Sequence, residues 1–333
     1  MRKLTIIIFV LVLVWAGYLL AGDWLIKRQT SAFLQQNDET ISVGSFEIKG
    51  FPTGFSLSFN DFRFFDPRDF NGYAAPRLNL RAAGWAPWRV NITFPQEQAL
   101  LVNGHEITVT SENLAGRLRA RPSLSLPLAQ LRVSGNGLTI TSPWTGLAEI
   151  DTARFELNAA NDARTYALLL DIAEMRPDPA FQEATRAHGL AALPDRIDTI
   201  RMDADLRLSA PLDRFTGQAP LHLEAIEIRN IEIAWGPMRL SAAGHLAPDE
   251  RGFATGRLDF VAEGWNFLPP LLVEAGLLAP GVVTLAQNLF QRLASEDRKE
   301  GKVRLPLVMK NGRMSLGPLP LGPAPMFSAD QAE

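Results

Sequence analysis

Alternation of apolar and polar residues with a period of two is the feature that most limits the folds open to this chain. It recurs in most segments after residue 40, for example in residues 54–59 (GFSLSF) and 197–208 (IDTIRMDADLRL). Short turn signals such as Asn103-Gly104 separate these segments. Such segments form strands with one buried face, and connections this short leave no room for helical crossovers. We therefore expect a mainly β (α+β) fold: a large, curved antiparallel sheet with a few short helices.

Changes of phase inside long strands predict where the sheet bends. The apolar positions shift at Asn60-Asp61, and they shift twice between Leu221 and Ile233. A change of phase inside a strand is typical of a β-bulge, and bulges bend sheets. Residues 177–189 interrupt the alternation with proline near the start and glycine at the end, which predicts one short helix.

The hairpin of residues 235–260 carries a glycine inside each strand, Gly244 and Gly256. With a turn over residues 248–252, the two glycines would lie nearly opposite each other and leave a notch where the sheet can fold over. The helix predicted over residues 281–296 is the candidate to fill that notch. Its apolar stripe is expected to contain Val282, Leu285, Leu289 and Leu293.

Residues 4–21 (LTIIIFVLVLVWAGYLLA) are almost entirely apolar and contain no charge. As a helix this run is about 27 Å long, close to the roughly 30 Å of a bilayer core. Leu19 and Ala21 make a poor cleavage site, and Trp24 continues the apolar character, so we expect an uncleaved transmembrane anchor over residues 4–26. A cleaved signal peptide is the alternative.

The charges around the anchor favour a cytoplasmic N-terminus at residues 1–3, because Arg2 and Lys3 precede the apolar run without any acid. The expected location is the inner (cytoplasmic) membrane, spanned once, with most of the chain in the periplasm. The bilayer is then one partner, reached through the N-terminal helix.

The remaining chain divides by composition into three parts. Residues 27–40 are expected to form a helical linker, residues 41–317 an antiparallel β-rich envelope domain, and residues 318–333 a Pro-rich, disordered tail. The similarity of residues 85–90 (WAPWRV) to residues 235–240 (WGPMRL) allows two similar β units within the domain, although chance explains it equally well.

Catalytic, metal and cofactor signals are missing from the sequence. His105, His188, His222 and His245 lack a second ligand at metal-binding spacing. There is no cysteine, nucleophile elbow or phosphate-binding loop. We expect no catalytic residues, no metal and no cofactor, and hence no enzyme, with a hydrolase assembled from distant residues left open.

Asp203 and Asp205 project from the same face of a predicted strand and could share a proton. Arg201 and Arg207 flank them on that face, so a solvated ladder of charges is the preferred interpretation. With a net charge of −3 and no dominant basic tract, nucleic acid is not an expected partner.

Tryptophans are the remaining candidates for a binding site. On the concave side of a bent sheet, Trp85, Trp88, Trp235 and Trp265 could line an apolar groove for an acyl chain. For most tryptophans, packing in a sheet core is the competing interpretation.

Gly50-Phe51-Pro52 and residues 312–323 (GRMSLGPLPLGP) carry a resemblance to a known family. On these motifs the chain resembles the bacterial envelope family called domain of unknown function 2125, over most of its length after the anchor. The resemblance implies an inner-membrane-anchored, largely periplasmic β-rich protein and no catalytic residues. More distantly, glycine-interrupted hairpins behind an N-terminal anchor are similar to AsmA-type envelope proteins, which are associated with lipid transport.

Two functions follow as hypotheses. In the first, the β-rich domain binds lipid or another apolar envelope molecule on its concave face. In the second, the protein has a filled core and no small-molecule ligand, and its exposed strand edges or tail contact an envelope protein partner.

Overall fold

The computed structural model describes residues 40–50, 54–66, 70–102, 104–143, 146–187, 190, 192–216, 221–296 and 302–327. Within these residues the protein is mainly β with a few short helices, which confirms the predicted class. It divides into two compact units, and the bounds of the units extend beyond the described residues. Unit 1 comprises residues 1–164 and 210–221, and unit 2 comprises residues 165–209 and 222–333. Whether the resemblance of residues 85–90 to residues 235–240 reflects two similar β units stays a prediction.

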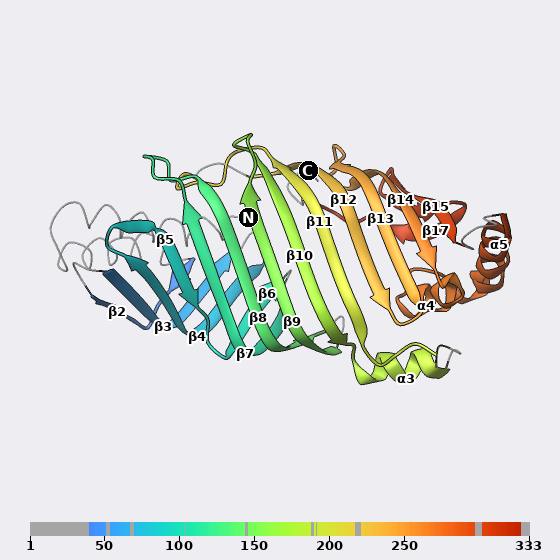
Figure 1. Cartoon of the computed structure of the whole chain (residues 1–333), viewed down its shortest axis with the longest axis horizontal. Helices are drawn as coiled ribbons and strands as arrows, with labels where there is room; N and C mark the ends of the chain where they lie inside the picture. Colours follow the sequence, from blue (N-terminus) through green and yellow to red (C-terminus); the bar gives the residue numbers. More distant parts are fainter. Residues whose placement is uncertain are drawn as a thin grey trace. The chain divides into compact units, whose positions relative to one another are not determined.

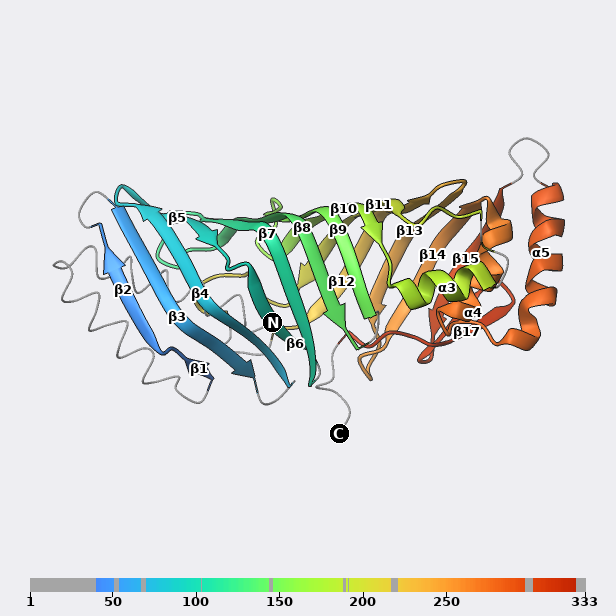
Figure 2. The same cartoon turned by 90° about the horizontal axis from the view of Figure 1, so that it is seen from below.

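The strands of unit 1 are β1 (Ile41–Ser42), β2 (Ser45–Lys49), β3 (Gly54–Asp66), β4 (Asn71–Ala83), β5 (Ala86–Thr93), β6 (Glu97–Val102), β7 (His105–Ala120), β8 (Leu128–Ser142) and β9 (Gly146–Ala159). They form an antiparallel meander, in which β1 and β2 both pair with β3, β3 pairs with β4, and β8 pairs with β7 and β9. Strands β5 and β6 each pair with β4 on one side and with β7 on the other, so together they occupy the place of one interrupted strand. Figure 2 shows β2, β3 and β4 side by side.

The change of phase at Asn60-Asp61 is present, but the predicted bulge there was wrong. The register of β3 on β4 continues unbroken from Phe59 opposite Leu78 to Phe62 opposite Ala75. All four of these side chains are buried, so both strands change phase together. The left-handed backbone of Asp61, with φ of 51°, makes the change without an inserted residue.

The two faces of the unit 1 sheet differ in polarity. One face, the apolar face of unit 1, is buried; its residues include Phe55, Leu57, Phe59, Val90 and Leu118. The alternate residues on the same strands form the polar face of unit 1, which is largely exposed and rich in arginine and asparagine.

Unit 2 is a second antiparallel meander, and Figure 1 shows β10 to β14 side by side in chain order. Its strands are β10 (Thr165–Arg176), β11 (Ile197–Leu208), β12 (Leu223–Trp235), β13 (Met238–Pro248), β14 (Ala254–Glu263), β15 (Val303–Lys310), β16 (Arg313–Leu316) and β17 (Leu319–Pro323). Its helices are α3 (Pro179–Ala187), α4 (Leu268–Glu274) and α5 (Val283–Glu296), with 3-10 turns η1 (Trp265–Phe267) and η2 (Pro280–Val282). The helix predicted over residues 177–189 is therefore present as α3.

The two register shifts predicted between Leu221 and Ile233 are confirmed. Against β11, the register of β12 shifts once at Glu224 and again next to Arg229. Against β13, it shifts between Ile228 and Ile231. Each extra residue bends the strand locally and increases its twist.

Gly244 and Gly256 do not face each other, which corrects the prediction for the hairpin. Gly244 pairs with Leu258 and Gly256 pairs with Leu246, so the glycines are offset diagonally. The turn is closed by Pro248 opposite Ala254. The centre of the turn therefore lies one residue later than predicted. Each residue of β13 consequently pairs with a residue of β14 two positions beyond the predicted partner.

Helix α5 does not fill a notch at these glycines, so that expectation was also wrong. The cluster that holds α5 contains Ala286 and Phe290 packed with Ala262 and Val303. Leu285, predicted on the apolar stripe, is 63% exposed. The other predicted stripe residues, Val282, Leu289 and Leu293, do pack against this cluster, so the stripe is confirmed at three of its four positions. Ala286 is buried in place of its neighbour Leu285.

The segment after residue 317 is structured as far as Phe327, so the prediction of a disordered tail from residue 318 was wrong over that range. Strand β17 pairs with β16. Beyond it, the backbone N–H of Phe327 donates to Gly252 O at 2.8 Å. Prolines are compatible with this edge strand because it needs few backbone donors.

None of the helices in the described part of the chain is both long and apolar enough to cross a membrane. The predicted anchor over residues 4–26 lies outside the described residues, as do the predicted linker over residues 27–40, except for residue 40, and the Gly50-Phe51-Pro52 motif, except for Gly50.

Candidate binding face

An aliphatic surface runs across three neighbouring strands of unit 2. Opposite residues on paired strands point to the same face of a sheet, so the register fixes its members. One row joins Leu170, Met202 and Ile231, and the next joins Ile172, Ile200 and Ile233. We call this set the aliphatic strip: Leu168, Leu170, Ile172, Ile200, Met202, Ile231 and Ile233.

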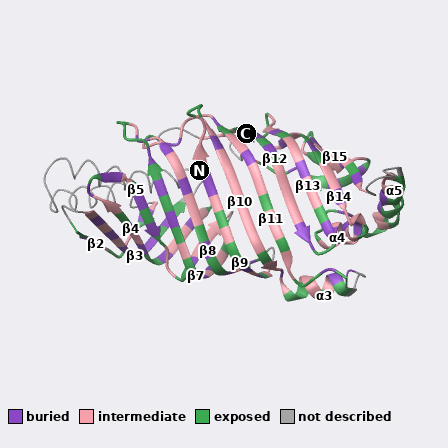
Figure 3. Cartoon of the chain, viewed as in Figure 1, coloured by how far each residue is buried: buried purple, intermediate pink, exposed green. Residues whose placement is uncertain are grey.

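Every side chain of the aliphatic strip is half-buried, so each keeps part of its surface open. Figure 3 shows this intermediate exposure along β10 and β11. Two neighbours on the same face are fully packed, since Ala204 is 0% and Ile228 is 4% exposed. Three strands at about 4.8 Å spacing make the strip roughly 10 Å wide, enough for a hydrocarbon chain to lie along it.

The opposite face of the same strands is a ladder of charges, as the sequence indicated for Asp203 and Asp205. Arg229, exposed by the bulge on β12, bonds to both carboxylates, from Nη2 to Asp203 and from Nη1 to Asp205. These bonds raise the pKa of Arg229 above its ordinary value. Arg201 and Arg207 form ion pairs with other carboxylates, Arg201 with Asp171 and Arg207 with Glu224. A charge ladder explains the aspartate pair without a shared proton.

Replacing Arg229 by glutamine should lower the free energy of unfolding by no more than about 1 kcal/mol, because all three side chains are substantially exposed. The loss should shrink in high salt, which screens the remaining repulsion between the two carboxylates. Urea unfolding at low and high salt measures both effects. Arg257→Gln, which removes another exposed ion pair, is the matched control. A loss above about 2 kcal/mol that persists in high salt would contradict a solvated ladder.

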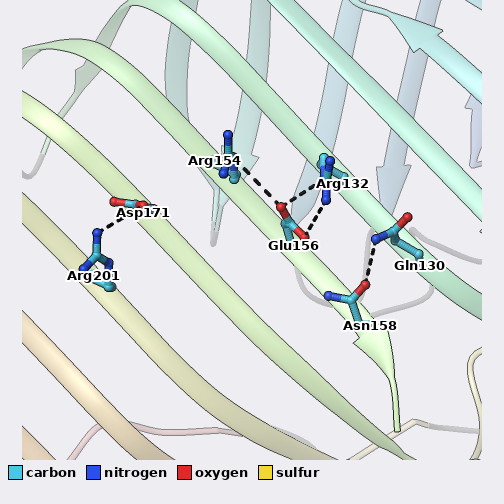
Figure 4. A network of polar contacts seen from close by, with 7 residues as sticks. All are labelled: Gln130, Arg132, Arg154, Glu156, Asn158, Asp171 and Arg201. Carbon is cyan, nitrogen blue, oxygen red and sulfur yellow. Dashed lines mark hydrogen bonds and ion pairs between the residues drawn. The ribbon is translucent and has the colours of Figure 1, made fainter.

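On the polar face of unit 1, one carboxylate is buried. Glu156, 8% exposed, lies between two arginines (Figure 4). Arg132 holds it in a two-point contact, with Nε 2.9 Å from Oε1 and Nη2 3.1 Å from Oε2. Arg154 Nε is 3.9 Å from Oε1. Glu156 is thus a paired structural carboxylate, and nothing in its surroundings requires proton transfer.

The four tryptophans predicted to line a groove lie in different environments. In unit 1, Trp85 is 78% exposed, while Trp88 packs on Ala120 and Leu126. In unit 2, Trp235 is 6% exposed and its indole N–H donates to Pro194 O at 2.7 Å. Trp265 makes an edge contact with Phe290 in the cluster that holds α5. Trp235 and Trp265 are therefore packed in hydrophobic clusters, whereas Trp85 projects into solvent.

The described residues contain no group of three side chains able to hold a metal ion. His105 and His245 are exposed strand residues, and His245 Nδ1 lies 3.0 Å from Glu227 Oε2. His188 lies outside the described residues. The sequence contained a partial signal for the aliphatic strip, since Ile200 and Met202 lie in a segment that alternates, whereas Leu169 interrupts the alternation in residues 168–172. The sequence does not show how far these side chains are exposed to solvent, and that exposure distinguishes a binding face from a core.

These features define a class: a mainly β protein of antiparallel meanders, each with one polar face, and with an aliphatic face in unit 2 that stays partly open. The chain belongs to the family described as "Uncharacterized protein conserved in bacteria (DUF2125)", which matches residues 26–325. This confirms the resemblance seen in the sequence. Comparison with curated proteins and with solved structures gave no match. The more distant similarity to AsmA-type envelope proteins stays a prediction.

Proposed function

We propose that this protein is a single-pass, membrane-anchored envelope protein whose β-rich part binds the hydrocarbon portion of a lipid, or of another apolar envelope molecule, on the aliphatic strip. The observation that carries the proposal is the half-buried state of all seven strip side chains. A group of partly exposed aliphatic side chains on neighbouring strands is unfavourable in water and is typical of a binding site.

The chemistry of the strip favours a hydrocarbon ligand. Its members are aliphatic side chains and one methionine, with no hydroxyl, amide or charge among them. Each methylene group that leaves water on such a surface contributes about 0.8 kcal/mol. The proposed location is the inner membrane, with most of the chain in the periplasm and the bilayer reached through residues 4–26, where the sequence predicts an anchor.

Leu170 and its neighbour Leu169 provide a matched pair for the test. Leu170 lies in the strip opposite Met202, whereas Leu169 lies on the other face opposite Asp203, and both are half-buried. We expect Leu170→Asn to weaken lipid binding about tenfold, because it removes about 1–2 kcal/mol of apolar contact. Leu169→Asn should leave binding unchanged.

The probe is a phospholipid with a photoactivatable acyl chain, added to the full chain in mild detergent. Labelled peptides identified by mass spectrometry should map to β10, β11 and β12, and thermal unfolding of both variants checks that they fold alike. Labelling confined to the N-terminal apolar segment, or labelling that Leu170→Asn leaves unchanged, would refute the proposal.

The alternative function is that of a structural or interaction protein with a filled core and no small-molecule ligand. The packed clusters around Trp235 and Phe290 favour it for that end of unit 2. A specific envelope protein recovered by crosslinking in membranes, together with absence of lipid labelling on the strip, would decide for this alternative.

A further inference from the structure

Four arginines on the polar face of unit 1 lie close together without acidic partners. Arg89 on β5 pairs directly opposite Arg119 on β7, and Arg81 and Arg117 both lie opposite Asn91 in the next row. Among the described residues, none of the four forms an ion pair; Arg117 Nε donates to the neutral Asn91 Oδ1 at 3.3 Å. We call Arg81, Arg89, Arg117 and Arg119 the basic face.

The charge on the basic face is unfavourable for unit 1 alone. Like charges directly opposite each other on paired strands are destabilising, as at Arg89 and Arg119. The arginines on the polar face of unit 2 behave differently, since Arg201, Arg207 and Arg229 each meet a carboxylate of a neighbouring strand. An unneutralised cluster of arginines fits an anionic partner outside the chain.

Three large apolar side chains are exposed at the end of the unit 1 sheet next to the basic face. They are Trp85 in the β4–β5 turn, Leu124 in the β7–β8 loop and Phe215, at 78%, 75% and 44% exposed. Strand β5 pairs with β7, which brings the first two turns to the same end. Phe215 joins them because Arg214 N–H donates to Ser125 O at 3.1 Å. We call these three residues the apolar tip.

The basic face and the apolar tip adjoin each other. Trp85 precedes Arg89 by four residues and Leu124 follows Arg119 by five, so each of these two tip residues lies within roughly 15–20 Å of an arginine of the basic face. Arginine guanidinium groups bind phosphate in two-point contacts. Exposed tryptophan and leucine side chains enter the interfacial layer of a bilayer, where the apolar part of the ring leaves water.

We propose that unit 1 docks on a bilayer surface that carries anionic lipids, with the basic face on the phosphate groups and the apolar tip in the interfacial layer. The apolar tip favours a bilayer over a soluble polyanion, because a polyanion has no apolar layer into which the exposed side chains of three loops could insert. The surface lies on unit 1 and is independent of the aliphatic strip on unit 2, so either proposal can fail without the other.

The chain contains no cysteine, so Ser123→Cys beside Leu124 creates a single labelling position. The full chain, carrying an environment-sensitive fluorophore there, is held in nanodiscs. In the first arrangement, the nanodisc itself contains phosphatidylglycerol. In the second, the nanodisc contains only phosphatidylcholine, and vesicles that contain phosphatidylglycerol are added. Pure phosphatidylcholine replaces phosphatidylglycerol as the comparison in each arrangement. We expect a blue shift of emission with phosphatidylglycerol in at least one arrangement, and none with phosphatidylcholine alone.

Arg89→Gln with Arg119→Gln should raise the amount of anionic lipid needed for the half-maximal shift at least tenfold, since each arginine near such a surface contributes about fivefold. The matched control is Arg207→Gln with Arg257→Gln, which removes the same charge from ion pairs of unit 2. It should leave the shift unchanged. An absent shift in both arrangements, an equal shift with phosphatidylcholine, an equal loss in the control, or a shift produced by heparin without lipid would overturn the proposal.

Discussion

Gly256→Ala is expected to lower the free energy of unfolding by about 3 kcal/mol or more, and Gly244→Ala by a similar amount. The backbone φ is 144° at Gly256 and 148° at Gly244, a region that residues with a side chain rarely adopt. An added Cβ would lie 2.2 Å from His245 O at Gly256 and 2.3 Å from Arg257 O at Gly244. Relief would require the two strands to separate, which breaks their backbone hydrogen bonds.

Alanine variants of two other glycines of unit 2 distinguish the cost of backbone strain from the cost of a steric clash of the added Cβ. At Gly276 φ is 69° and an added Cβ meets nothing within 4 Å, so alanine there should cost only about 1–2 kcal/mol of backbone strain. At Gly281 there is neither a left-handed backbone nor a neighbour within 4 Å, and alanine should be nearly neutral. Urea unfolding of the four variants gives the comparison. If Gly256→Ala proved as mild as Gly281→Ala, the close approach of β13 and β14 would be wrong.

Trp235→Ala should destabilise the protein by about 3–5 kcal/mol, because it empties a packed site. The ring of Trp235 stacks on Phe181 of α3, with ring centroids 6.5 Å apart, and its cluster includes Met238 and Leu271. Trp235→Phe keeps the stacking but loses the bond to Pro194 O, and it should cost about 1–2 kcal/mol.

Trp85→Ala is the control for Trp235, since Trp85 is 78% exposed and its loss should change stability by less than about 0.5 kcal/mol. Chemical unfolding monitored by far-ultraviolet circular dichroism measures all three variants. If Trp235 lined an open groove, its removal would weaken ligand binding and leave stability nearly unchanged. A cost below about 1 kcal/mol for Trp235→Ala would therefore restore the groove interpretation.

Local features of the fold could be predicted from the sequence with good accuracy. The alternating segments are strands, α3 and α5 lie within two residues of their predicted bounds, and β12 carries both expected register shifts. The apolar patterns that predict these features are each contained in a short stretch of the chain. The pairing of Gly244 and Gly256 failed because a turn centre displaced by one residue moves every partner across the hairpin by two.

Features of the candidate sites depended on neighbours that alternation does not reveal. The sequence indicated that Asp203 and Asp205 belong to a charge ladder, but their partner is Arg229 of the next strand. Tryptophans were chosen as groove residues by type, whereas the packing assigns Trp235 to a core and leaves Trp85 exposed. The arginines of the basic face are unremarkable in the sequence, where the overall net charge is −3.

The sequence by itself determined that this chain forms antiparallel strands with one apolar and one polar face, because side chains alternate between faces with a period of two. It also identified the family, through short motifs and the pattern around them. Only the tertiary structure decided how fully each apolar face is covered and which charges meet a partner, because burial and ion pairing are set by strand neighbours distant in the chain. That decision separates the half-buried aliphatic strip of unit 2 from the filled core of unit 1.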